Sequence, residues 1–82
     1  MITEKQERFR RIFPARVDKI RDQLRILGNC SNRSSYEWKQ DRITMFFALI
    51  LQEFSTLAKS FGVQLTAEVD GKDIHAYEYT KQ

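Results

Sequence analysis

QDRITMFFALILQEFSTLAKSF occupies residues 40–61, and it carries the strongest structural signal in this chain of 82 residues. Its apolar side chains recur at intervals of three and four residues, at Ile43, Phe46, Phe47, Ile50, Phe54, Leu57, Ala58 and Phe61. A repeat near 3.6 residues places them on one face of a helix. The sequence therefore predicts a helix over 40–61 that stops at Gly62, with Phe47, Ile50, Phe54 and Leu57 among its most buried residues.

The apolar surface of this helix is wide, because Met45, Leu49 and Leu51 extend it beyond the main stripe. One short helix cannot cover so broad an arc. We therefore expect it to be either the central helix of the domain or part of a dimer interface. Met45 and Leu49 are candidate contacts with a protein partner.

A second helical pattern precedes the first, with apolar residues at Phe9, Phe13, Val17, Ile20, Leu24 and Leu27. Pro14 interrupts it, since proline lacks an N–H and disfavours the helical conformation of the residue before it. We expect a short N-terminal helix over 3–12 and a firmer one over 15–27, which Gly28 would end in a left-handed conformation.

The pattern changes to alternation after residue 62, where Val63, Leu65, Ala67 and Val69 are separated by polar residues. This is typical of a strand, and the Asp70-Gly71 pair that follows suits a two-residue type I′ turn. The register would place Val69 opposite Lys72, Ala67 opposite Ile74 and Leu65 opposite Ala76.

The expected fold class is α+β, in one domain over residues 1–82. It has two main helices, at about 15–27 and 40–61, a short N-terminal helix, and a C-terminal β-hairpin packed on the long helix. The alternative is a small all-α bundle in which the C-terminal tail is irregular.

Basic residues concentrate in the first half. The chain has 14 Lys and Arg against 11 Asp and Glu, and residues 1–42 alone carry a net charge of +5. A basic half can attract phosphate or an acidic partner, and the candidate nucleic-acid contacts are Arg10, Arg11, Arg21 and Arg25. Asp18 and Asp22 precede two of these arginines at a helical spacing of three, which predicts ion pairs within the helix.

Catalytic and metal-binding patterns are not expected. Cys30 and His75 are the only cysteine and histidine, and a cysteine after a helix C-terminus does not gain the lowered pKa of a thiol at a helix N-terminus. There is no glycine-rich phosphate loop and no metal-ligand spacing, so we expect no enzyme and no cofactor. One cysteine, a charged N-terminus and an apolar run of only residues 45–51 indicate a cytoplasmic protein that does not span a membrane.

Residues 27–38, LGNCSNRSSYEW, form a polar connection between the helical patterns. Asn and Ser side chains bond back to the main chain in turns, and Ser34 with Glu37 has the spacing of a capping box. The plain interpretation is a well-specified connection. A binding loop is the alternative, with Arg33 on a phosphate and Tyr36 or Trp38 against a base or a protein partner.

This connection resembles a pattern, L-x-G-N-x-S-N-[RK]-S-x-Y-x-[YW], of small uncharacterised helical proteins from bacterial plasmids, phages and other mobile elements. The positions that carry the resemblance are Leu27, which stands one residue closer to the glycine than in the pattern, and Gly28, Asn29, Ser31, Asn32, Arg33, Ser34, Tyr36 and Trp38. Those proteins have a Thr after the second aromatic residue, as the cap of the next helix, where this chain has Lys39. The resemblance implies a bacterial accessory protein borne on such an element, and it implies no activity.

Two functions remain. The first is a non-enzymatic interaction module that self-associates, as a homodimer, or binds another protein. The second is a nucleic-acid-associated accessory or regulatory factor that uses the basic half. The apolar width of residues 43–61 favours the first function, and the basic half and the resemblance favour the second. We prefer the first, because interspersed acids dilute the basic half and no recognition-helix motif is present.

Overall fold

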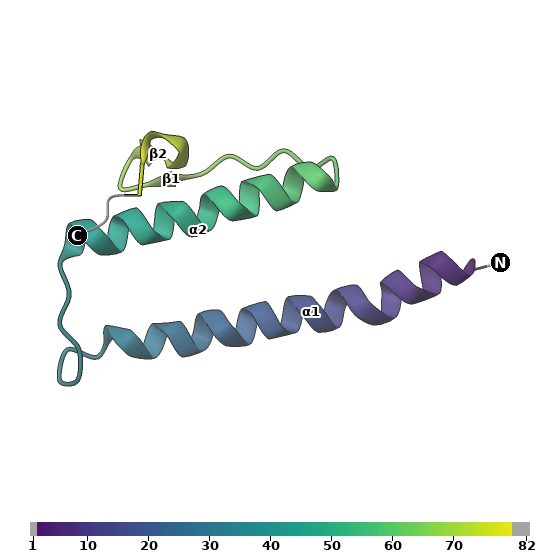
Figure 1. Cartoon of the computed structure of the whole chain (residues 1–82), viewed down its shortest axis with the longest axis horizontal. Helices are drawn as coiled ribbons and strands as arrows, with labels where there is room; N and C mark the ends of the chain where they lie inside the picture. Colours follow the sequence, from purple (N-terminus) through teal and green to yellow (C-terminus); the bar gives the residue numbers. More distant parts are fainter. Residues whose placement is uncertain (1, 80–82) are drawn as a thin grey trace. The chain divides into compact units, whose positions relative to one another are not determined.

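The structure is a computed structural model that describes residues 2–79. It divides into two compact units, Met1–Glu37 and Trp38–Gln82. The first unit holds helix α1, Glu4–Gly28, and a 3₁₀ turn, η1, at Asn29–Ser31 (Figure 1). The second unit holds helix α2, Gln40–Ser60, strands β1, Glu68–Val69, and β2, Lys72–Asp73, and a 3₁₀ turn, η2, at Ile74–Ala76.

Helix α1 runs unbroken through Pro14, so the expected separate helix over 3–12 is wrong. Its start is fixed by a capping box, in which Thr3 Oγ1 accepts from the Gln6 N–H at 3.2 Å and Gln6 Oε1 accepts from the Thr3 N–H at 2.9 Å. A proline inside a helix costs roughly 3 kcal/mol. Capped turns before Pro14 and strong helix formers after it offset that cost.

The end of α1 also differs from expectation. Gly28 has a right-handed conformation, with φ −58°, and the chain continues into η1 before it leaves helical geometry at Asn32. Asn32 Oδ1 then accepts from both the N–H and the hydroxyl of Ser34, at 3.0 and 2.8 Å. The expected capping box of Ser34 with Glu37 does not form, because α2 begins at Gln40 and its N-cap position is Lys39. Helix α2 begins after Lys39, without a side-chain cap.

Helix α2 confirms the expected long helix to within one residue at its C-terminus. Gly62, with φ +70°, ends it. The Gly62 N–H donates to the Lys59 carbonyl at 3.0 Å, and the Val63 N–H donates to the Ala58 carbonyl at 2.9 Å. These two bonds make a Schellman motif and satisfy carbonyls that the helix end would leave without partners.

The C-terminal hairpin is present and antiparallel. Asp70 and Gly71 have φ of 51° and 77°, as a type I′ turn requires. Val69 pairs with Lys72 as expected, and Glu68 pairs with Asp73.

The hairpin is shorter than the sequence predicts. One further bond joins the Ile74 N–H to the Ala67 carbonyl at 3.2 Å. Asp73 Oδ1 then accepts from the His75 N–H at 2.8 Å and starts η2. The expected pairing of Leu65 with Ala76 is therefore wrong, because a side-chain cap competes with the strand ladder.

The core of the second unit lies between α2 and the segment that follows it. Ile74 and Ala48 are fully buried, and Met45 and Ser55 are 6% and 4% exposed. Tyr77 is held against strand β1, because its hydroxyl donates to the Val69 carbonyl at 2.8 Å.

The face of α2 expected in the core is not the face that is buried. Phe47 and Leu57 are 56% and 45% exposed, and Ile50 and Phe54 are half-buried. The reason is that the residues after α2 pack on its small and polar side chains instead.

Neither of the helices within residues 2–79 combines the length and the apolar content that crossing a bilayer requires.

Candidate interaction surface

Helix α2 has two chemically different faces. The covered face consists of Met45, Ala48, Gln52 and Ser55, which pack under the residues that follow the helix. With 3.6 residues per turn, a second set of side chains falls on the opposite face. We call it the α2 seam; it consists of Ile43, Phe47, Ile50, Phe54, Leu57 and Phe61.

The α2 seam is large and apolar, and much of it is open. Phe47, Leu57 and Phe61 are all exposed, and Phe46 beside them is exposed as well. Soluble proteins rarely leave a contiguous apolar surface of this kind in water unless it binds something. The seam residues follow one another at spacings of four and three, which is the repeat of helices that pack side by side.

Helix α1 carries a matching row of side chains. We call it the α1 seam; it consists of Phe13, Val17, Ile20, Leu24 and Leu27, again at spacings of four and three. No residue of α1 is buried. Each helix therefore has an apolar seam whose side chains are exposed or only half-buried.

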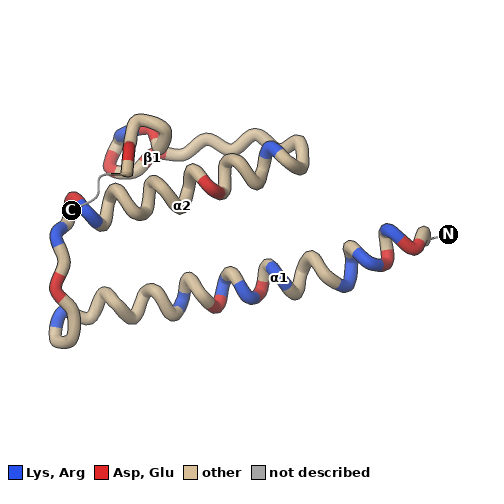
Figure 2. The backbone as a smooth tube through the Cα atoms, in the orientation of Figure 1, with Lys and Arg blue, Asp and Glu red and all other residues tan. Residues whose placement is uncertain are grey.

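The rest of α1 is densely charged (Figure 2). Arg25 pairs with Asp22 at 3.1 Å, and Arg21 lies 3.9 Å from Asp18, which confirms the expected ion pairs. Two of the four arginines that we considered for nucleic-acid contact thus have an acidic neighbour. Arg10 and Arg11 are exposed on the same helix.

The other candidate partner contacts are dispersed. Arg33 and Tyr36 are exposed in the connection of the first unit, whereas Trp38 is half-buried at the start of the second. Met45 lies in the core, at 6% exposed, and Leu49 is half-buried. Arg33 and Tyr36 thus belong to the first unit, and Trp38, Met45 and Leu49 belong to the second.

All residues of the two seams belong to the apolar stripes that the sequence predicts. The signal was present, because both helical stretches keep the same alternation of four and three over two heptads or more. What the pattern alone did not give was the side of α2 on which the chain folds back.

Among residues 2–79, no group of three or more His, Cys, Asp or Glu side chains is placed to hold a metal ion. Comparisons with protein-family models, with curated proteins and with solved structures found no match to this chain. Function is therefore inferred from the surfaces themselves.

Proposed function

We propose that this chain is a self-associating interaction module, in which the α1 seam and the α2 seam are buried against those of a second copy. The observation that carries the proposal is the pair of uncovered seams, one on each helix, with the same spacing. The product is a helical bundle built from two chains.

The size of the uncovered surface supports association. Full burial of one large apolar side chain contributes roughly 1.5–3 kcal/mol. A domain of this length has a net stability of only about 4–12 kcal/mol. Because the two seams hold eleven such side chains, the free energy available from covering them is large on the scale of the fold.

The width of the α2 surface supports a second copy as the occupant. Exposed Phe46 extends the surface to one side of the seam, and half-buried Leu51 extends it to the other. One neighbouring helix can cover a narrow stripe of residues spaced by four and three. A broader apolar surface needs contact with more than one helix. A second copy supplies two helices of matching repeat.

Charge favours one pairing within the dimer. Helix α1 carries eight Lys and Arg against four Asp and Glu, a net charge of +4, whereas α2 has two of each sign. Two α1 helices side by side would bring like charges together, which disfavours that arrangement. The α1 helix of one copy therefore pairs with the α2 helix of the other.

Light scattering coupled to size-exclusion chromatography tests the proposal. A micromolar Kd corresponds to a binding free energy of roughly −8 kcal/mol. At about 100 µM protein, well above such a Kd, we expect twice the mass of one chain. Phe47→Glu, on the exposed part of the α2 seam, should give a single-chain mass because a carboxylate cannot be buried there without a partner.

Thr56→Glu is the matched control. Thr56 is exposed on α2 but lies off the seam, so this variant should keep the dimer. A single-chain mass for the unaltered protein at that concentration, or a dimer of Phe47→Glu, would overturn the proposal.

A further inference from the structure

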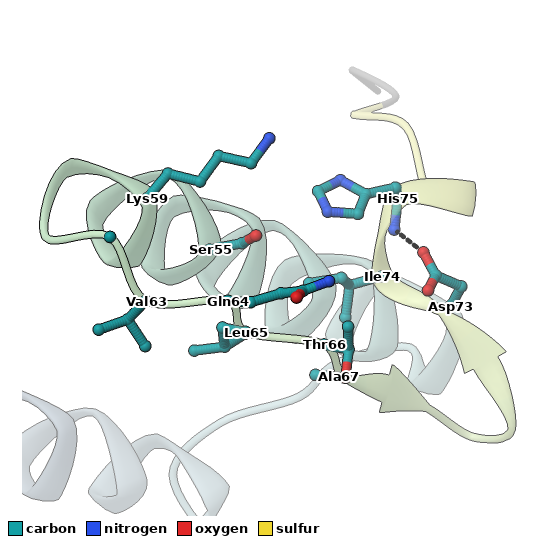
Figure 3. A pocket seen from close by; sticks show the side chains of 11 residues that line it. Ser55, Lys59, Val63, Gln64, Leu65, Thr66, Ala67, Asp73, Ile74 and His75 are labelled. Carbon is teal, nitrogen blue, oxygen red and sulfur yellow. Dashed lines mark hydrogen bonds between the residues drawn. The ribbon is translucent and has the colours of Figure 1, made fainter.

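A pocket of about 390 Å³ lies on the covered side of α2 (Figure 3). Ser55 and Lys59 of α2 form one wall, and residues 62–67 and 73–75 form the rest. All of these residues belong to the second unit. The pocket is therefore separate from the α2 seam, which is on the opposite face of the helix.

Ser55 is the unusual side chain of this pocket. The other hydroxyls of α2, those of Thr44, Thr56 and Ser60, each donate to the carbonyl four residues earlier. Ser55 makes no such bond although it is only 4% exposed. No side-chain oxygen or nitrogen of residues 2–79 is both sealed and without a partner, so its Oγ is reached from the pocket. Figure 3 shows that oxygen directed into it.

The main chain along one side of the pocket is also unpaired. Within the described part of the chain, no hydrogen bond joins the backbone of Gln64, Leu65 or Thr66 to another residue. This follows from the early end of the hairpin, since the chain leaves the ladder at Asp73 and offers these residues no opposite strand. Their N–H groups remain available as donors.

The polar lining of the pocket includes the ammonium of Lys59, the carboxylate of Asp73 and the imidazole of His75. Lys59 lies at one side of it and His75 at the other, as Figure 3 shows. Asp73 is the one acidic residue of the lining, and its carboxylate already accepts from the His75 N–H at 2.8 Å. A ligand entering here meets an ammonium, a buried hydroxyl and unpaired N–H groups.

We propose that this pocket binds a small ligand through a carboxylate or phosphate group. The anionic oxygens accept from the Ser55 hydroxyl, the Lys59 ammonium and the unpaired main chain of residues 64–66. Bonds of this kind to a charged acceptor are the stronger class of hydrogen bond. Ser55 is the most buried polar residue of the lining, at 4% exposed, and it anchors the group.

Titration of the ¹⁵N-labelled full chain, followed by amide chemical shifts, tests this inference. The probes are inorganic phosphate and sodium acetate, each raised to about 10 mM, tenfold above a millimolar Kd, at constant ionic strength with chloride as the reference. We expect saturable shifts at Ser55, Lys59 and residues 64–66. A response to phosphate alone assigns a phosphate ligand, and a response to acetate alone assigns a carboxylate.

Three variants make the test specific. Ser55→Ala and Lys59→Gln should each weaken binding by about tenfold or more, as loss of a hydrogen bond to a charged group implies. Lys39→Gln removes an exposed lysine outside the pocket and should leave the affinity unchanged. The inference is overturned if neither anion gives saturable shifts beyond those of chloride, or if Lys39→Gln weakens binding as much as Lys59→Gln.

Discussion

The side-chain amide nitrogen of Gln52 lies 2.6 Å from the carbonyl oxygen of Ile74, and this bond ties the middle of α2 to η2. The same nitrogen donates to the Tyr77 carbonyl at 3.0 Å. Both acceptors are main-chain groups on a segment with little regular structure of its own. Gln52 therefore takes the place of the strand partner that this segment lacks.

Gln52→Met should destabilise the second unit by about 1–3 kcal/mol, because the part-buried Tyr77 carbonyl loses its donor and the Ile74 carbonyl keeps only the Tyr77 N–H, at 3.4 Å. For a chain of this size that corresponds to a melting temperature lower by about 4–8 °C per kcal/mol. Gln64→Met is the control, since Gln64 is exposed and makes no hydrogen bond. Equal melting temperatures for the two variants would show that Gln52 is not an anchor.

Ile74→Ala should cost about 2–5 kcal/mol, as truncation of a fully buried aliphatic side chain does. Ile74 has no exposed surface, and it seats η2 on α2. Urea denaturation provides the measurement. Val63→Ala, at an exposed position of the same unit, should change the unfolding free energy much less, and a reversal of this order would contradict the core described above.

Replacement of glycine by alanine should change the free energy of unfolding in opposite directions at Gly62 and Gly28. Gly62→Ala should destabilise by about 1–2 kcal/mol, because φ there is +70° and a Cβ disfavours that conformation. Gly28→Ala should stabilise by about 0.5–1 kcal/mol, since Gly28 is right-handed and helical. A Cβ meets no atom within 4 Å at either site, so thermal melts of the two variants isolate the backbone effect.

The nucleic-acid alternative makes a separate prediction for α1. Binding to duplex DNA should be weak at low salt and should fall with a log–log slope of about −0.9 for each phosphate neutralised. Because Asp18 and Asp22 lie beside Arg21 and Arg25, the double variant Asp18→Asn with Asp22→Asn should bind more tightly than the parent.

A fluorescence titration of labelled DNA at about 50 mM salt, where phosphate contacts are strong, measures that difference. Arg21→Ala with Arg25→Ala should flatten the slope by up to about two units. Binding that neither pair of substitutions alters would remove α1 from consideration as a DNA-contacting surface.

Helix α2 and the Asp70-Gly71 turn were predictable, because their signals are local: a periodic run of residues and a dipeptide that accepts positive φ. The continuity of α1 was not. Pro14 is a strong local signal for a break, but the capped helix on one side and the helix formers on the other outweighed it. Such a balance of several terms cannot be obtained from one residue.

The extent of the hairpin and the identity of the core could not be predicted from the sequence, for a different reason. The alternation over residues 63–69 does not indicate that Asp73 caps a turn and ends the strand ladder. The buried face of α2 holds Ala48 and Ser55, which no hydrophobicity argument selects ahead of Phe47. The unpaired groups of the pocket result from that same early exit, so the pocket too was beyond the reach of the sequence pattern.

The division into two units has a kinetic consequence. Most contacts of each unit join residues close in sequence, such as Thr3 with Gln6, and proteins rich in such contacts fold within microseconds to milliseconds. In the proposed dimer the seams are buried when two chains meet, which is a second-order step. Refolding of that dimer should therefore slow in proportion as the protein is diluted, while the helical signal still returns at a rate independent of concentration.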